Sequence, residues 1–126
     1  MTGQLRAVVV GAGWAGEGHT LALRHAGVDV VAICARRQDV VRSVADRLGV
    51  EEASMDWRRT LENREPDIVA LATPAVLRGS VIEAATDLGC HIFCDKPLAT
   101  TAEEAEKLYR LVVEAGTKHA YAATNC

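Results

Sequence analysis

A short apolar run that ends in three closely spaced glycines constrains this sequence more than any other feature. Residues 7–10 read AVVV and are followed at once by GAGWAG, so that Gly11, Gly13 and Gly16 have the spacing G-x-G-x-x-G. The apolar run is typical of a buried strand, and helical periodicity follows the glycines. A strand, a glycine turn and a helix in this order predict a βα unit whose turn binds a dinucleotide.

Each glycine has its own physical role in this prediction. Gly11 permits the tight turn out of the strand, Gly13 lets backbone N–H groups approach a pyrophosphate, and Gly16 lets the helix pack close to the strand. The start of the helix adds N–H donors and the positive end of the helix dipole. The alternative is a glycine-rich turn without a ligand, and the flanking strand and helix argue against it.

The composition excludes several classes of protein. The 126 residues, of which 49% are hydrophobic and 25% are charged, suit one globular domain over residues 1–126. A net charge of −3 argues against nucleic-acid binding, and no apolar run approaches the ~20 residues that span a bilayer. No apolar segment precedes the first strand, so we expect no secretory signal and a cytoplasmic location.

The cysteines and histidines do not have the spacing of a metal site. The strand expected between Cys90 and Cys94 would hold them ~13 Å apart, too far for one disulfide or one zinc ion. We predict no metal and interpret the cysteines as small apolar core residues. The histidines are interpreted as structural or surface residues, and His19 as a residue that serves helix packing.

Strand and helix signals alternate along the chain and predict an α/β fold. Asp39 and Asp56 are the expected helix N-caps, and Gly27 and Gly49 the expected helix ends. The pattern predicts a doubly wound, mostly parallel sheet of about six strands (a Rossmann fold) with no second domain in this chain. The expected strands are 6–10, 28–34, 52–54, 68–72, 91–94 and 118–123, and the expected helices are 14–25, 39–48, 56–63, 76–88 and 101–115.

The residues after the second strand indicate which nucleotide is preferred. An acidic residue ≈ 20 positions past the glycines would bind a ribose 2′-OH, but Ala35 is found there and Arg36 and Arg37 follow it. Arginine can pair with a 2′-phosphate, which a carboxylate would repel. The sequence therefore favours NADP(H) and argues against FAD. NAD(H) stays open because arginine also stacks on adenine, and so does a purely solvating role for both arginines.

Two further motifs, Thr73-Pro74 and Asp95-Lys96-Pro97, follow later strands, at the edge where open α/β sheets bind ligands. With them in place, the chain resembles the N-terminal domain of the Gfo/Idh/MocA oxidoreductases. The resemblance is carried by VVVGAGWAG, VVAICARR, DIVALATPAVLRGSVIEAATDLGCHIFCDKPLATT and AYAATN, and it extends over essentially the whole sequence.

The resemblance implies cofactor contacts along the whole dinucleotide, and it adds the residues nearest the nicotinamide to those that the glycine motif and the arginines indicate. Together the expected cofactor-binding residues are Gly11, Gly13, Trp14, Ala15 and Gly16 near the pyrophosphate, Ala35, Arg36 and Arg37 near the adenosine ribose, Thr73, Pro74, Asp95, Lys96 and Pro97 toward the nicotinamide, and Asn125 after the last strand.

The resemblance also implies the chemistry, which is hydride transfer between a nicotinamide cofactor and a hydroxyl of a sugar, inositol or related polyol. Lys96 matches the family's lysine beside the nicotinamide, where a cation would stabilise a developing alkoxide. Pro97 restricts where Lys96 points. Two departures stand out: Asp95 replaces the usual Glu, and the family's C-terminal substrate domain has no counterpart in these residues.

Two other functions stay open on the sequence alone. One is a free-standing NADP(H)-binding module without catalysis, and the other is a remnant that binds no ligand. In either case Lys96 would be an ordinary solvated loop residue. An apolar face left exposed where a second domain docks would favour self-association into a homo-oligomer.

Overall fold

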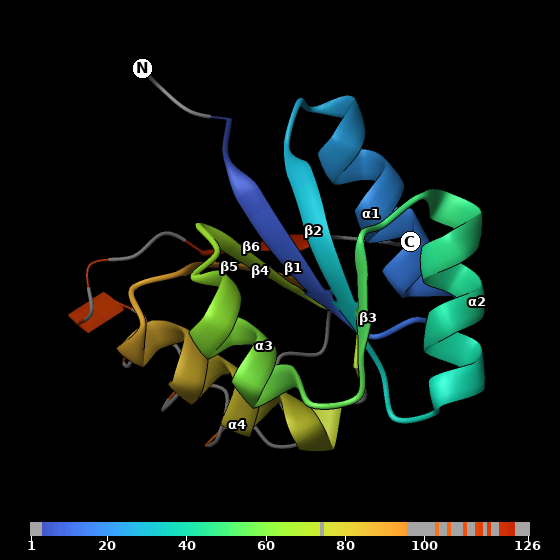
Figure 1. Ribbon diagram of the computed structural model, residues 1–126. Coiled ribbons are helices and arrows are strands. Elements are labelled where there is room, and N and C mark those ends of the chain that lie inside the picture. Colours follow the sequence, from blue (N-terminus) through green and yellow to red (C-terminus); the bar gives the residue numbers. More distant parts are fainter. Residues whose placement is uncertain are drawn as a thin grey trace.

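The computed structural model describes residues 4–73, 75–95, 103, 106, 110, 113–114, 116 and 119–122. Figure 1 shows a central sheet between two layers of helices, with α1 and α2 on one face and α3 and α4 on the other. The strands are β1 (Arg6–Val10), β2 (Asp29–Cys34), β3 (Glu52–Ser54), β4 (Ile68–Leu71), β5 (His91–Asp95) and β6 (His119–Ala122), and the helices are α1 (Trp14–His25), α2 (Gln38–Leu48), α3 (Trp57–Arg64) and α4 (Ala75–Asp87).

The sheet has six strands in the order β3-β2-β1-β4-β5-β6, and all neighbouring pairs are parallel. The chain runs outward from β1 through β2 to β3, returns to the other side of β1 as β4, and runs outward again. This confirms the predicted doubly wound parallel sheet. The reversal between β1 and β4 is the point at which open α/β sheets form a crevice at their carboxyl edge.

The predicted boundaries of the six strands and of the first four helices are close to the observed ones, but one predicted cap is wrong. The helix predicted over 101–115 lies largely outside the described residues. Helix α2 begins at Gln38 with Arg37 as its N-cap, so Asp39 lies inside the first turn. A carboxylate there still favours the helix through its dipole, although it caps no N–H group. The cap predicted for α3 is confirmed, because the Asp56 carboxylate accepts a hydrogen bond from the Arg59 N–H at 3.1 Å.

Alternate residues of β1 supply two separate apolar clusters, one on each face of the sheet. Val8 belongs to the cluster that contains Leu61 of α3, and Val9 to the cluster that contains Val44 of α2. Successive side chains of a strand point to opposite faces, and helices cover both faces here, so the strand is apolar throughout. In the part of the chain that the structure describes, no helix is long and apolar enough to cross a membrane.

The packing roles expected of His19 and of two cysteines are confirmed. His19 is 6% exposed, and its ring centroid lies 4.9 Å from that of Phe93 in β5. Cys34 and Cys90 are buried free thiols, and the Cys90 thiol donates a hydrogen bond to the Pro66 carbonyl at 3.3 Å. The side chains of the other two cysteines lie outside the described part of the chain.

Candidate functional site

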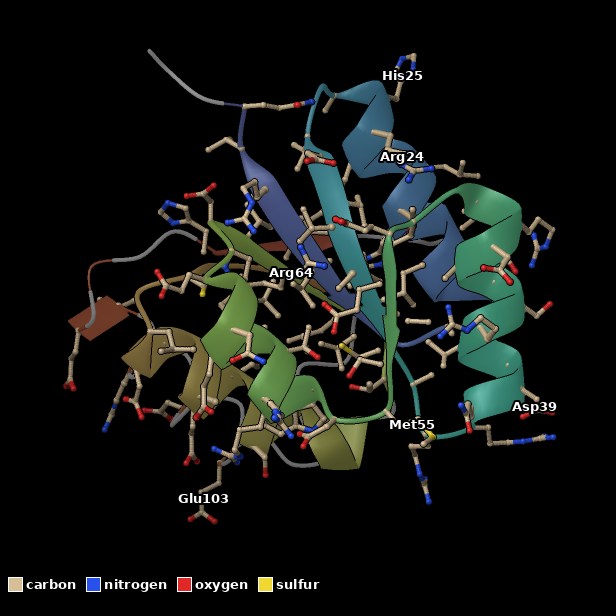
Figure 2. The ribbon with its side chains drawn as sticks, in the orientation of Figure 1. Arg24, His25, Asp39, Met55, Arg64 and Glu103 are labelled. Atoms are coloured by element: carbon tan, nitrogen blue, oxygen red, sulfur yellow. The ribbon has the colours of Figure 1, made fainter. Side chains whose placement is uncertain are left out.

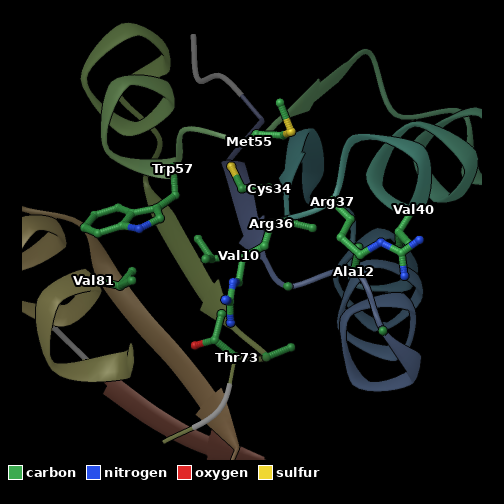
Figure 3. Close-up of a pocket in the computed structure, with 14 residues that line it drawn as sticks. Val10, Ala12, Cys34, Arg36, Arg37, Val40, Met55, Trp57, Thr73 and Val81 are labelled. Carbon is green, nitrogen blue, oxygen red and sulfur yellow. The ribbon is translucent and has the colours of Figure 1, made fainter. Parts of the chain in front are cut away.

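A cavity of about 600 Å³ opens at the carboxyl ends of β1, β2 and β4. This volume is within the usual range for small-molecule sites. Figure 2 shows Met55, on the rim of the cavity, at the opposite end of the molecule from His25 of α1. The lining residues, drawn in Figure 3, are Val10, Gly11, Ala12, Gly13, Cys34, Ala35, Arg36, Arg37, Val40, Met55, Trp57, Ala72, Thr73 and Val81.

Backbone hydrogen bonds continue the sheet beyond the strand ends and hold the rim of this pocket. The Gly11 N–H donates to the Cys34 carbonyl at 2.7 Å, and the Ala72 N–H donates to the Val10 carbonyl at 2.8 Å. These bonds connect the loops that follow β1, β2 and β4. The pocket is therefore built on rigid backbone, which is what a preorganised binding site requires.

The three glycines of the turn differ in how much space surrounds them. Gly11 has a φ of 125°, and an added Cβ would lie 2.8 Å from the Ala72 carbonyl. A Cβ on Gly16 would overlap the Gly11 carbonyl oxygen, whereas nothing lies within 4 Å of a Cβ built on Gly13. Gly11 and Gly16 are thus required by packing within the protein, and Gly13 leaves open space beside the pocket.

The start of α1 supplies hydrogen-bond donors at the same place. Gly13 is the N-cap and no side chain caps the helix, so the first N–H groups have no intrahelical partners and can bind an anion. Glu17 in this turn forms a bidentate ion pair with Arg47 of α2, at 2.7 and 2.8 Å. The hydrogen bond from Arg47 lowers the pKa of the Glu17 carboxyl and partly offsets its repulsion of an anion.

The two arginines after β2 both line the pocket, but their surroundings differ. The Arg37 guanidinium pairs with the Asp39 carboxylate at 2.8 Å. Arg36 makes no ion pair with any other residue in the described ranges. In Figure 3 the Arg36 guanidinium is drawn over the middle of the pocket, and Arg37 lies on the side of Val40. Arg36 is therefore the better placed of the two to bind an anion inside the pocket.

The side of the pocket away from α2 is apolar. It is formed by Met55, which follows β3, by Trp57 at the start of α3, by Val81 of α4 and by the end of β2 at Cys34. Burial raises the pKa of the Cys34 thiol to about 12, so the thiol is protonated at neutral pH and is not a nucleophile. This wall can hold a flat apolar group but has no catalytic side chain.

The structure brings together many, though not all, of the residues expected to bind the cofactor. Those that line the pocket are Gly11, Gly13, Ala35, Arg36, Arg37 and Thr73. Ala15 and Gly16 lie in the first turn of α1 and do not line it, and Asp95 ends β5. Pro74, Lys96, Pro97 and Asn125, and the side chains of Trp14 and Asp95, lie outside the described part of the structure.

Sequence reasoning missed the apolar wall, above all Met55 and Trp57. The signal was available, because these residues follow a predicted strand and every parallel strand of the sheet ends at the same edge. The strand is only three residues long, and no motif marks its end. Among the residues described, no cluster of histidine, cysteine or acidic side chains is arranged to hold a metal ion.

Comparison with known proteins gives a family match over nearly all of the chain. Residues 5–122 match the Gfo/Idh/MocA family, described as an oxidoreductase family with an NAD-binding Rossmann fold. The chain is 30% identical over 122 residues to levoglucosan dehydrogenase from Pseudarthrobacter phenanthrenivorans, in an alignment that covers 88% of this chain and 31% of that enzyme. The chain thus spans about a third of the length of the curated relatives that it matches.

Solved structures agree with this match. A levoglucosan dehydrogenase in complex with NADH and L-sorbose has a TM-score of 0.87 and 29% identity, over 95% of this chain and 35% of its own. Biliverdin reductase from Synechocystis sp. PCC 6803, in complex with biliverdin and NADP+, has a TM-score of 0.84 and 28% identity, over 93% of this chain and 37% of its own. The glycine turn, the sheet order and the family match lead to one conclusion: this chain belongs to the Gfo/Idh/MocA oxidoreductases and corresponds to their NAD-binding Rossmann domain.

Proposed function

We propose that residues 1–126 form the cofactor domain of an oxidoreductase that prefers NADP(H) and acts on a hydroxyl of a sugar or related polyol. The observation that carries this proposal is the pocket in which the glycine turn meets Arg36, which makes no ion pair among the described residues. The solved relative that contains NADH and L-sorbose supports sugar chemistry. The solved biliverdin reductase that contains NADP+ supports the choice of the phosphorylated cofactor.

The residues around the glycine turn fit a diphosphate. The space beside Gly13 lets phosphate oxygens approach the backbone, and the uncapped start of α1 offers N–H donors and a partial positive charge. A diphosphate could reach both features without any change in the fold. It would accept hydrogen bonds from N–H groups at the start of α1 that have no partner within the helix.

The residues after β2 fit a 2′-phosphate. Ala35 stands where a carboxylate would select the free 2′-OH, so the edge of the pocket has no acidic group that repels phosphate at this position. The Arg36 guanidinium can donate two parallel hydrogen bonds to phosphate oxygens. Arg37 is held by Asp39 and contributes less. We therefore assign the preference for NADP(H) to Arg36.

The chemistry would take place at the other end of the cofactor. When bound, the nicotinamide supplies the hydride transfer, and the protein supplies position and electric field. Thr73 lines the pocket on that side, and Asp95 closes β5 beside β4. We assign to the Lys96 ammonium the role of donating hydrogen bonds to the substrate oxygen, so that it stabilises the negative charge that develops there.

Calorimetric titration of the chain with NADPH and with NADH tests the cofactor assignment. We expect the wild type to bind NADPH more tightly, and Arg36→Ala to weaken NADPH binding by about tenfold or more, because a hydrogen bond to a charged group is lost. Binding of NADH should change by less than about threefold. Arg37→Ala is the matched control, with a smaller loss for NADPH. Equal weakening of both cofactors by Arg36→Ala would contradict the 2′-phosphate assignment.

The role of Lys96 is tested in an enzyme that contains this domain together with a substrate domain. Lys96→Ala should lower kcat by about a hundredfold or more and leave the Kd for NADPH nearly unchanged. Lys96→Arg keeps the charge but not its position, and should restore little of the rate. Near-normal turnover of the alanine variant would show that Lys96 is an ordinary surface lysine.

A further inference from the structure

The apolar wall of the pocket contains Trp57, the only aromatic side chain among the described residues that line it. Figure 3 shows the indole on one side of the pocket, with Arg37 and Val40 on the other side and Val10 between them. We infer that Trp57 is the platform on which the adenine ring of the cofactor stacks. This assignment rests on the proposed function and adds a residue that the glycine motif and the arginines do not indicate.

The floor of the pocket is the open end of a hydrophobic core. Trp57 packs against the cluster that contains Val10, Cys34 and Val81, and these three residues also line the pocket. These three residues are at most 3% exposed, so the apolar surface of this wall that solvent reaches belongs to Met55 and the half-buried Trp57. A flat apolar group that covers it would remove apolar surface from water, which stabilises the complex in proportion to the area covered. In the adenosine half of a dinucleotide, the flat apolar group is the purine ring.

The backbone that carries Trp57 is held by a local network of hydrogen bonds. The Asp56 N–H donates to Ser54 Oγ at 3.0 Å, and the Asp56 carboxylate caps α3 at the Arg59 N–H. The Thr60 hydroxyl lies 2.7 Å from Ser54 Oγ. The network joins the end of β3 to the first turn of α3, where Trp57 is the first residue. The position of the indole is therefore set before any ligand arrives.

The ring itself also has a fixed partner. The guanidinium carbon of Arg58 lies 4.7 Å from the centroid of the Trp57 ring, a distance at which the cation and the π system attract each other. The side chain is half-buried against the core cluster as well. An aromatic side chain that is already ordered loses little conformational freedom when a base stacks on it.

The distribution of charge across the pocket sets the orientation of the ligand. The arginine side, with Arg36 pointing inward, suits the ribose and its 2′-phosphate, and the Trp57 side suits the base. The glycine turn between them suits the diphosphate. An adenosine 2′-phosphate unit is the part of NADP(H) that has a base and a phosphate on the same ribose. The adenine therefore lies between the indole and the arginine loop.

Two measurements on the 126-residue chain test this assignment with adenosine 2′,5′-bisphosphate, which contains the base and both phosphates but no nicotinamide. The first is NMR of the saturated wild-type complex, in which we expect nuclear Overhauser effects between the adenine H2 or H8 proton and the Trp57 indole protons. Trp57→Phe identifies the indole resonances, because the chain has only one other tryptophan, Trp14.

The second measurement is calorimetry of a matched set of variants with the same ligand and with NADPH. Trp57→Leu keeps apolar bulk but loses the aromatic face, so it should bind both ligands about tenfold more weakly, whereas Trp57→Phe should stay within about threefold of the wild type. Arg59→Ala is the matched control, because it removes an exposed cation from the same turn and keeps the backbone N–H that the Asp56 carboxylate caps, and we expect a change of less than about threefold. Thermal unfolding of each variant shows that the compared chains are folded.

The outcomes separate the assignment of Trp57 from the proposed function. Equal affinities for the Phe and Leu variants, or no contact between adenine and indole in the saturated wild-type complex, would overturn the assignment and leave the proposed function standing. Failure of the wild type to bind either ligand would contradict the proposed function itself. Weaker binding of the Leu variant together with the adenine–indole contact would support both.

Discussion

The glycine turn and the arginine loop meet at the same pocket but are built in opposite ways. In the turn, residues 11–16, Gly11 and Gly16 are surrounded by backbone atoms so closely that a single added carbon would collide with them. In the loop, residues 35–37, Arg36 and Arg37 are exposed and support no part of the core. The fold therefore constrains the residues of the turn, whereas core packing places no constraint on the two arginines.

Because of this difference, we expect the two regions to recognise different parts of the cofactor. On the proposed function, the turn would recognise what all such dinucleotides share, the diphosphate, with backbone groups that the fold fixes. The loop would recognise what distinguishes NADP(H) from NAD(H), with side chains that can change without loss of the fold. Changes in the turn should therefore cost stability or all binding, and changes in the loop should cost selectivity. Four predictions test this contrast.

Gly16→Ala should have the largest effect. Its Cβ would overlap the Gly11 carbonyl oxygen, so α1 must move away from β1, which should cost about 3 kcal/mol or more of unfolding free energy. Gly18→Ala is the matched control in the same helix, because nothing lies within 4 Å of a Cβ there, and it should stabilise by up to about 1 kcal/mol. Urea unfolding measures both. Equal stabilities would show that the close approach of helix and strand is unimportant.

Gly13→Ala should weaken binding without harming the fold. Its surroundings leave room for a methyl group, and its φ of −83° is open to any residue, so stability should stay within about 0.5 kcal/mol of the wild type. The methyl group would occupy the space beside the diphosphate, so NADPH and NADH should both bind about tenfold more weakly. Calorimetry gives the affinities. If the affinity for only one of the two cofactors fell, the prediction that the turn recognises their shared diphosphate would be wrong.

Cys34 connects the two regions, because its backbone carbonyl accepts a hydrogen bond from the Gly11 N–H. Its thiol is buried. Burial raises its pKa from 9.0 to about 12. Above pH 9 the unfolded chain loses this proton and the folded chain keeps it, so stability falls as pH rises. Cys34 should contribute a loss of about 1.4 kcal/mol near pH 10. The difference in unfolding free energy between wild type and Cys34→Ala, measured from pH 7 to 10, should shrink by this amount, and a constant difference would contradict the prediction.

Asp39→Asn should have the smallest effect and the opposite sign. It removes the carboxylate that holds Arg37 and leaves a second guanidinium available to the 2′-phosphate. Binding of NADPH should tighten by about twofold at low salt, because exposed pairs of this kind are weak, and binding of NADH should not change. Asp46→Asn alters the net charge equally on the same helix and is the control. Tighter binding by both variants would indicate only a general charge effect.

The sequence was sufficient for the fold because its signals are local. The alternation of apolar strands with capped helices gave the doubly wound sheet, and the cap at Asp56 was identified correctly. The cap at Asp39 was misplaced by two positions. The N-cap of α2 is Arg37, whose side chain makes no hydrogen bond to the helix backbone, so no capping residue type marks this position in the sequence. The glycine turn and the arginines were found because motif and position mark them.

The apolar wall was not found because nothing local marks it. Met55 and Trp57 look like an ordinary loop and helix start, and Val81 looks like an ordinary core residue of α4. They become parts of one site only when β1, β2, β3 and α4 converge at the carboxyl edge of the sheet. The side chains of this wall come from segments far apart in the sequence, and the spacing between these segments does not indicate that they meet.

By itself the sequence determined the order of the strands and helices, the glycine turn and the charge that follows β2, because each depends on residues within a few positions of one another. Only the tertiary structure showed that Asp39 pairs with Arg37 and not with Arg36, and that an indole from α3 stands on the other side of the pocket from Arg37. The physical reason is that packing between elements fixes the direction of each side chain and closes the pocket around it. The residues in contact there are far apart in the sequence.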